Sequence, residues 1–299
     1  MRRLILAAAL AVPLALAFPA VALAAGTVTT SQGEAGYYTQ SFATVFTQVD
    51  GTWDLLPTAG NLGVTTGDIE ATSGAIGLQL CNSSDKYMAQ IGVLQTSDAP
   101  ATFEVAYGAG DSTSTAADPC PDGGLLGTGS APRPVATGLT GLVIGDSVQA
   151  QIEEYHHGIL FTAAVSAGGI ELTSWSQWIS GGPAWFNEAG AGVVQDPANV
   201  TACPGGGCGT DLADFSDVYA VTDQGAEGGF ADWNPVTVES ASNGSVFVAP
   251  GPLSPATGRT CIAGHWVHRK HHRRHWVAGS CTGGGPSSFS VLTGAPNGV

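Results

Sequence analysis

The stretch GDSVQAQIEEYHHGILFTAAVSAGGIELTSWSQW, residues 145–178, decides the fold class. It holds three runs rich in β-branched and aromatic residues, namely Ser147–Glu154, Ile159–Val165 and Ile170–Trp178. Polar and apolar residues alternate in the first run, as they do in a strand with one buried face. Gly145-Asp146 precedes the first run and Gly168-Gly169 separates the last two, and both pairs suit tight turns. The stretch therefore predicts an antiparallel meander.

The same pattern extends in both directions along the chain. Turn residues recur about every ten positions, and a helical period of 3.6 is not sustained after the first 25 residues. Further strands are predicted at Gly36–Trp53 (two strands), Ala75–Leu80, Tyr87–Gln95 and Thr102–Tyr107, with a long surface loop at Gly108–Pro134. We therefore expect an all-β fold, an antiparallel β-sandwich, in one domain over residues 26–299.

The first 25 residues have the pattern of a secretory signal peptide. Arg2-Arg3 precede an apolar run from Leu4 to about Val21, and the small residues Ala22-Leu23-Ala24-Ala25 suit cleavage. No later stretch is long and apolar enough to span a bilayer. We expect a secreted, extracellular, monomeric protein whose six cysteines form disulfides.

Charge is distributed unevenly along the chain. All 24 Asp and Glu residues lie between Glu34 and Glu239, where only Lys86 and Arg133 oppose them, a net charge of −22. Five basic residues and five of the seven histidines fall in one late segment, Arg259–Cys281. An acidic body repels nucleic acid, so no nucleic-acid partner is expected, and its self-repulsion weakens in acid.

Two short segments each present one polar group among apolar neighbours. Met88–Gly92 reads as a strand in which Gln90 shares a face with Met88 and Leu94, and Ala184–Glu188 reads as a strand in which Glu188 shares a face with Ala184 and Phe186. An amide and a carboxyl held together in a partly dry, concave sheet can activate water for peptide hydrolysis, because desolvation raises the pKa of a carboxyl toward that of a general base. We therefore expect Gln90 and Glu188 to lie on neighbouring strands, with side chains that converge in one cleft.

A series of ordered motifs surrounds these two residues. They are Gly36-Tyr37-Tyr38, Phe46–Trp53, Ala75–Leu80, Ala89–Val93, Phe103–Tyr107, Ile144–Val148, Trp185–Glu188, Leu212–Val218, and the closing strands Asn243–Pro255 and Ser287–Leu292. In this order they resemble the glutamic peptidases, or eqolisins, which are secreted, acid-acting endopeptidases with a concanavalin-like β-sandwich. The resemblance covers nearly the whole mature chain.

The resemblance implies a catalytic pair and a reaction. Glu188 would take a proton from the attacking water and later protonate the leaving amine, and Gln90 would hold the water and stabilise the oxyanion. The substrate would be a protein or peptide, and no metal or cofactor would be needed. Glu104 matches a supporting glutamate of the family, but it is equally consistent with a solvated strand residue, so we assign it no catalytic role.

The chain departs from the family at the substrate cleft. Ala75 stands where a tryptophan is usual, Gln79 where an aspartate is usual, and a second tryptophan and its proline are missing around Val105–Gly108. The resemblance is thus to a divergent member. The alternative is a catalytically degenerate sandwich that binds carbohydrate or cell-envelope polymers through its concave face and basic segment.

The basic segment reads as a hairpin inserted at about residues 259–284. Two His-Trp-Val triplets, at His265 and His275, flank a polar centre, and Cys261 and Cys281 would tie the hairpin ends. A metal site, a pH sensor and a solvated loop are alternatives to the reading we favour, an electrostatic contact with the acidic body or with an anionic polymer of the cell envelope.

The remaining disulfides follow from the resemblance and from elimination. Cys203–Cys208 is expected from its short loop and from the family likeness, and Cys81–Cys120 is what remains. His156-His157 lies at a predicted hairpin turn, where a solvated tip is expected.

Overall fold

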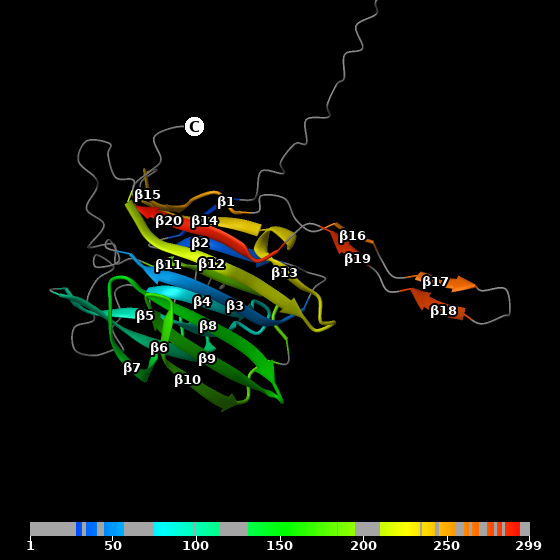
Figure 1. Cartoon of the computed structure of the whole chain (residues 1–299), viewed down its shortest axis with the longest axis horizontal. Helices are drawn as coiled ribbons and strands as arrows, with labels where there is room; N and C mark the ends of the chain where they lie inside the picture. Colours follow the sequence, from blue (N-terminus) through cyan, green and yellow to red (C-terminus); the bar gives the residue numbers. More distant parts are fainter. Residues whose placement is uncertain are drawn as a thin grey trace, which may run out of the picture.

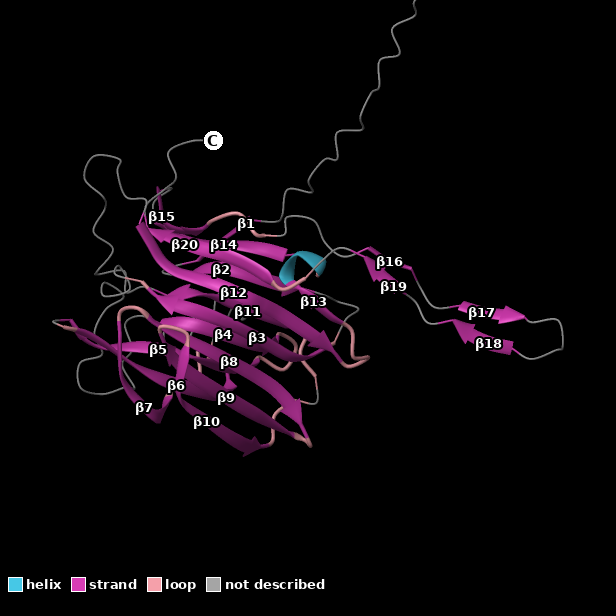
Figure 2. Ribbon diagram, in the orientation of Figure 1, coloured by secondary structure: helices cyan, strands magenta, loops and turns pink. Residues whose placement is uncertain are grey.

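A computed structural model describes most of the chain after the first 27 residues. The described residues are 28–31, 34–40, 45–56, 75–98, 100–113, 131–183, 185–194, 210–233, 235–242, 245–254, 260–262, 265–268, 274–277, 280–282 and 285–293. The predicted signal peptide lies outside this part of the chain. Strands dominate the described residues, and one short 3-10 turn, η2 (Phe230–Asp232), is the helical element among them (Figure 2).

The strands form a β-sandwich of two sheets with seven strands each, which do not close into a barrel, as the sequence predicted (Figure 1). Sheet A runs in the order β14-β2-β11-β4-β5-β6-β7, and sheet B in the order β10-β9-β8-β3-β12-β20-β15. Adjacent strands are antiparallel, and β14 and β15 form a hairpin that joins the sheets. At the margins, β1 (Val28–Ser31) pairs with β14 in parallel and β13 (Glu227–Gly229) pairs with β12.

The strand bounds are as follows. In sheet A they are β14 (Pro235–Ser242), β2 (Glu34–Gln40), β11 (Glu188–Val194), β4 (Ala75–Asn82), β5 (Tyr87–Asp98), β6 (Ala101–Asp111) and β7 (Val135–Val143). In sheet B they are β10 (Ile170–Ser180), β9 (Gly158–Ala167), β8 (Asp146–Tyr155), β3 (Phe46–Leu55), β12 (Thr210–Thr222), β20 (Ser287–Thr293) and β15 (Ser245–Pro250).

Alternate residues of both sheets build one core between them. Leu78 and Ile91 of sheet A are fully buried in the same cluster as Trp53 and Phe161 of sheet B. Because side chains alternate along a strand, the residues between these core positions point to the outer face of each sheet. The candidate site lies on the outer face of sheet A.

The predicted meander is confirmed as β8, β9 and β10. Its second turn has positive φ at both Gly168 and Gly169, as type I′ hairpins require. The turn that precedes the meander, between β7 and β8, centres on Gly145. Asp146 already belongs to β8, and its carboxylate accepts a bond from the Val143 amide at 2.9 Å.

The turn between β8 and β9 is made by two histidines. His156 and His157 have φ of 50° and 60°, a conformation in which the side chain of an L-residue is crowded. The predicted solvated tip is confirmed, since both residues are exposed.

The basic segment forms two short antiparallel ladders in the interval between β15 and β20. β16 (Thr260–Ile262) pairs with β19 (Ser280–Thr282), and β17 (His265–His268) pairs with β18 (Arg274–Val277). Both pairs extend away from the sandwich (Figure 1). The predicted symmetry is confirmed at the level of the backbone, because Trp266 lies opposite Trp276.

The same register sets Cys261 directly opposite Cys281. Their disulfide stays a prediction, because the structure describes only their backbone. Cys81 is disulfide-bonded. Its pairing with Cys120 also stays a prediction, since Cys120 lies outside the described residues, as do Cys203 and Cys208. No helix within the described ranges has the length and apolar character needed to cross a membrane.

Candidate active site

Gln90 lies in the middle of β5, on the outer face of sheet A. It is fully buried and lies directly opposite Gln79 of β4. The amide nitrogen of Gln90 donates to the side-chain oxygen of Gln79 at 2.6 Å. Met88 and Leu94 share this face, as predicted, and pack in small clusters separate from the main core. A fully buried amide pair of this kind is strongly oriented, since its polar groups would otherwise be desolvated without compensation.

Glu188 is on the same face as Gln90, but it begins a strand, whereas the prediction placed it at the end of one. It is the first residue of β11 and pairs with Cys81 of β4, which places it on the face of Gln79 and Gln90. The predicted strand Ala184–Glu188 is wrong. Phe186 instead forms an isolated bridge with Phe46 and packs in the main core, so it does not share a face with Glu188.

Asn187 explains where β11 begins. Its backbone amide donates to the carbonyl of Cys81 at 3.1 Å, and its side-chain oxygen accepts from the Ser83 amide at 2.8 Å. Its side-chain nitrogen lies 2.7 Å from Ser83 Oγ and 3.2 Å from Oε1 of Glu188. These contacts fasten the entry to β11 onto the turn after β4 and orient the Glu188 carboxyl. Glu188 is 2% exposed.

The prediction that Gln90 and Glu188 occupy neighbouring strands is wrong. β4 lies between β5 and β11. Gln79 of β4 is opposite Gln90 and diagonal to Glu188, and such neighbours have Cβ separations of roughly 5 Å and 7–8 Å respectively. The site is therefore two amides and one carboxyl in a line across three strands.

Gln79 is the functional candidate that the sequence did not reveal. It stood out only as a departure from the family aspartate. Its position depends on the register of β4 against β5, and no local pattern encodes that register.

A row of four glycines borders this line of polar residues. Gly92, Gly77, Gly192 and Gly36 are successive partners across β5, β4, β11 and β2. A Cβ at Gly36 would overlap the carbonyl oxygen of Ala191, and one at Gly77 would overlap that of Ile91. Only glycine permits this close approach of neighbouring backbones, which curves a sheet locally.

Other acidic groups complete the outer face of sheet A. Tyr38, opposite Gly190, donates its hydroxyl to the buried carboxylate of Glu34. Glu104 of β6 pairs with Leu94 and so shares the face of Gln90. Burial raises the pKa of Glu104, although a hydrogen bond from the Gly138 backbone opposes the shift. Glu104 thus shares the outer face of sheet A with Gln90, on the neighbouring strand β6.

No metal site accompanies this arrangement within the described residues, because none of their His, Cys, Asp and Glu side chains gather in threes with suitable geometry. The functional groups in the line described above are the two amides of Gln79 and Gln90 and the carboxyl of Glu188.

Comparison with known proteins adds no assignment. No protein-family model matches the chain, and no curated protein matches it either.

Proposed function

We propose that this protein is a secreted, acid-acting glutamic endopeptidase in which Gln90 and Glu188 activate water for the hydrolysis of peptide bonds. The observation that supports the proposal is that these residues, 98 positions apart in the chain, lie on one face of one sheet, both buried and both near Gln79 of the strand between them. Burying a carboxyl and two amides on a sheet face costs stability, and such groups are concentrated at functional sites.

The chemistry follows from the three side chains. Glu188 accepts a proton from a water molecule, which attacks the carbonyl carbon of the scissile peptide. The Gln90 side chain has two N–H groups; one donates to Gln79, and we propose that in the substrate complex the side-chain NH₂ group also donates to the oxyanion of the tetrahedral intermediate. Glu188 then returns its proton to the leaving amine. Gln79 acts as a positioning residue, since it fixes the direction of the Gln90 amide.

Substrate access sets a condition on this proposal. Gln90 is 0% exposed and Glu188 is 2% exposed, so a peptide reaches them only in a state where the outer face of sheet A has opened. Fewer of the 24 carboxyl groups are charged in acid, and this changes the electrostatic balance of the whole body. An assay should therefore include incubation of the protein at each pH before substrate is added.

The test is hydrolysis of a denatured protein substrate from about pH 2 to about pH 7, with and without Glu188→Gln. We expect activity confined to acid, unaffected by chelators or serine-directed reagents, and lowered by about 10² to 10⁴ in the variant, because the substitution keeps the shape but removes the base. Glu154→Gln on β8 of sheet B is the matched control and should retain activity.

Two results would reject the proposal. Full activity in Glu188→Gln would show that another group performs the chemistry. Absence of hydrolysis by the parent protein at every pH would favour the alternative, a non-catalytic sandwich that binds envelope polymers.

A further inference from the structure

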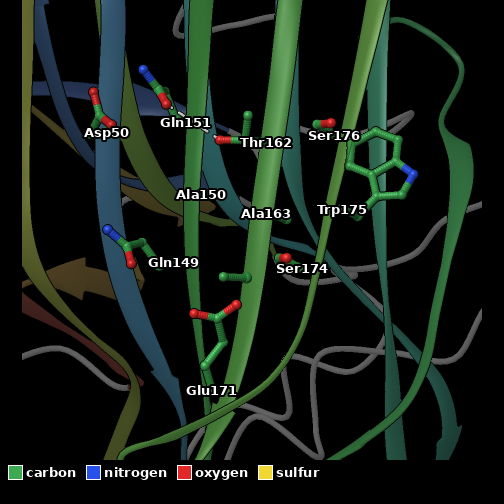
Figure 3. A pocket seen from close by; sticks show the side chains of 11 residues that line it. Asp50, Gln149, Ala150, Gln151, Thr162, Ala163, Glu171, Ser174, Trp175 and Ser176 are labelled. Atoms are coloured by element: carbon green, nitrogen blue, oxygen red, sulfur yellow. Dashed lines mark hydrogen bonds between the residues drawn. The ribbon is translucent and has the colours of Figure 1, made fainter.

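The outer face of sheet B carries a second polar region, which the proposed peptidase chemistry does not use. A groove of about 480 Å³ lies over β3, β8, β9 and β10 (Figure 3). Ladder partners place Asp50, Gln151, Thr162 and Ser176 in one row across these four strands. Gln149 and Ser174 belong to the next row along the same face. The groove is thus separated from the Gln90 face by the full thickness of the sandwich.

The lining chemistry excludes most ligand classes. None of the eleven lining residues is basic, whereas Asp50 and Glu171 are acidic, so the groove does not suit phosphates, sulfates or uronic acids. Its exposed side chains are mainly polar, which is unlike the apolar lining of pockets for lipids and other hydrophobic molecules.

The acidic groups are poorly placed to bind a cation. Asp50 is 8% exposed and is already engaged, since Gln48 donates to its Oδ2 at 2.6 Å and the Tyr219 side chain is also bonded to it. Glu171 belongs to β10, three strands from Asp50 in the sheet order. The two carboxyl groups therefore do not form a common cation site.

Between these acids lie five uncharged hydrogen-bonding side chains, Gln149, Gln151, Thr162, Ser174 and Ser176. The side-chain oxygen of Gln151 accepts a long bond from the Thr162 hydroxyl at 3.4 Å, a contact that does not use the Gln151 NH₂ group. Amides and hydroxyls both donate and accept, as the hydroxyl groups of sugars do. Rows repeated on adjacent strands, about 4.8 Å apart, can contact successive parts of an extended polyhydroxyl chain.

An exposed indole continues this face. Trp178, two residues after Ser176 on β10, is 43% exposed. Its ring nitrogen donates to the Tyr155 carbonyl at 3.1 Å, and its ring lies against Gly158, where a Cβ would be 2.6 Å from the ring atoms Cε2 and Nε1. The ring is thereby held in place on the same face of β10 as Ser176, outside the groove lining and toward the turn between β8 and β9. Aromatic rings fixed at a surface pack against the C–H faces of sugar rings and contribute large contact area at low entropic cost.

We propose that the groove over β3, β8, β9 and β10 binds a neutral oligosaccharide, with Gln149 and Gln151 as the principal hydrogen-bonding residues and Trp178 as a stacking platform. This site is independent of the peptidase proposal, because it lies on the other sheet and uses none of Gln79, Gln90 or Glu188.

The experiment titrates the full chain with soluble hexamers of β-1,4-linked glucose, α-1,4-linked glucose and β-1,4-linked N-acetylglucosamine, by calorimetry or NMR. We expect binding of at least one hexamer, and a loss of affinity of roughly tenfold or more in the double variant Gln149→Ala/Gln151→Ala, as expected when several ligand hydrogen bonds are removed. Trp178→Ala should also weaken binding. Glu188→Gln should leave it unchanged.

Gln177→Ala is the matched control. Gln177 is an exposed glutamine of β10, but it pairs with the core residue Phe161 and so lies on the opposite face of β10 from Ser176 and Trp178. Its binding should equal that of the parent. The proposal is overturned if no hexamer binds at millimolar concentration, if the double variant binds as well as Gln177→Ala, or if hexalysine competes with the bound hexamer, because competition would assign the groove to cationic peptides.

Discussion

Gln90 and Gln79 lie opposite each other on β5 and β4, and the amide of the first donates to the carbonyl oxygen of the second at 2.6 Å. Both side chains are fully buried. In this arrangement Gln79 determines which way the Gln90 amide points. A carboxylate at the Gln79 position could accept the same bond, so glutamine and aspartate would both supply an acceptor on this face.

The first prediction concerns that acceptor. Gln79→Leu leaves a buried N–H of Gln90 without its acceptor, which should lower the free energy of unfolding by about 1–3 kcal/mol. Hydrolysis at acid pH should fall through kcat, with little change in KM, because the oxyanion donor loses its orientation. Gln79→Glu keeps a carbonyl acceptor when protonated and should retain more activity in acid than Gln79→Leu. Urea denaturation and steady-state kinetics measure both effects. Equal activity in the two variants would contradict the positioning role.

The second prediction concerns Asn187, which fastens the start of β11. Asn187→Ala removes the side-chain bonds to Ser83 and Glu188 and should cost about 1–3 kcal/mol of stability. Ser83→Ala is the milder comparison, because it removes only the hydroxyl partner while the backbone bond to Asn187 remains. If Glu188 is the base, Asn187→Ala should also change the pH profile of hydrolysis, since a different environment surrounds the carboxyl. An unchanged profile in a folded variant would argue against this orientation.

The third prediction is a pH dependence of stability at Asp50. Burial, together with repulsion from Glu153 and Glu227, raises the pKa of Asp50 from 3.8 to about 6, although bonds from Gln48 and Tyr219 oppose the shift. The folded state therefore binds the proton more tightly than the unfolded state. The stabilisation of the folded state by this proton on Asp50 is complete below about pH 4 and is lost as pH rises to about 6.

Asp50→Asn removes this titration. Relative to the parent, the variant should gain about 1–3 kcal/mol of unfolding free energy between about pH 4 and about pH 7. Urea denaturation at several pH values measures the difference. A difference between the proteins that stays constant with pH would show that Asp50 does not titrate as described.

The fourth prediction concerns the turn between β8 and β9. His156 and His157 both have positive φ, which type I′ turns accommodate best with Asn-Gly. The double variant His156→Asn/His157→Gly should therefore raise the free energy of unfolding, by about 1–2 kcal/mol. Thermal and urea denaturation measure the gain. Lower stability in the variant would show that contacts of the histidine rings, such as that of His156 with Tyr155, outweigh the backbone strain.

The fifth prediction concerns the basic hairpin. Arg259–Val299 carries a net charge of +5, and the stretch from Glu34 to Glu239 carries −22. Deleting His265–Val277 should leave the sandwich folded and weaken binding to polyglutamate, with the parent binding most tightly at about pH 5 to 6, between ordinary carboxyl and imidazole pKa values. The binding should fall steeply with salt. Identical salt-dependent binding by the deletion variant would show that the hairpin is a solvated loop with no part in this binding.

The sequence predicted those elements whose patterns are local. The meander follows from alternation within β8 and from Gly168-Gly169, both of which can be read in a short window. β7 was missed, because Val135–Val143 lies mostly exposed and contains Gly138 and Gly141 at positive φ, so no apolar alternation marks it. Its pairing with β6 is what makes it a strand.

The candidate site divides in the same way. The face of Gln90 was predicted, because β5 alternates regularly around it. The entry of Glu188 was not, since the start of β11 is set by contacts of Asn187 with residues about a hundred positions earlier. The place of Gln79 in the line likewise depends on strand register, which is a property of two strands together.

The glycine row has a consequence for how this protein can diversify. Gly36 and Gly77 abut backbone atoms of the next strand, and a Cβ at Gly192 would be 2.6 Å from the carbonyl oxygen of Ala35. Elsewhere, substitution of one side chain by a smaller one can make room for a larger neighbour. A peptide carbonyl remains whichever residue occupies the position, so no such substitution makes room here. Changes that tune specificity must therefore accumulate around Gly36, Gly77 and Gly192 while these three glycines stay fixed. In a directed-evolution library of β2, β4, β5 and β11, functional clones should be enriched for variation beside these glycines and depleted of variation at them.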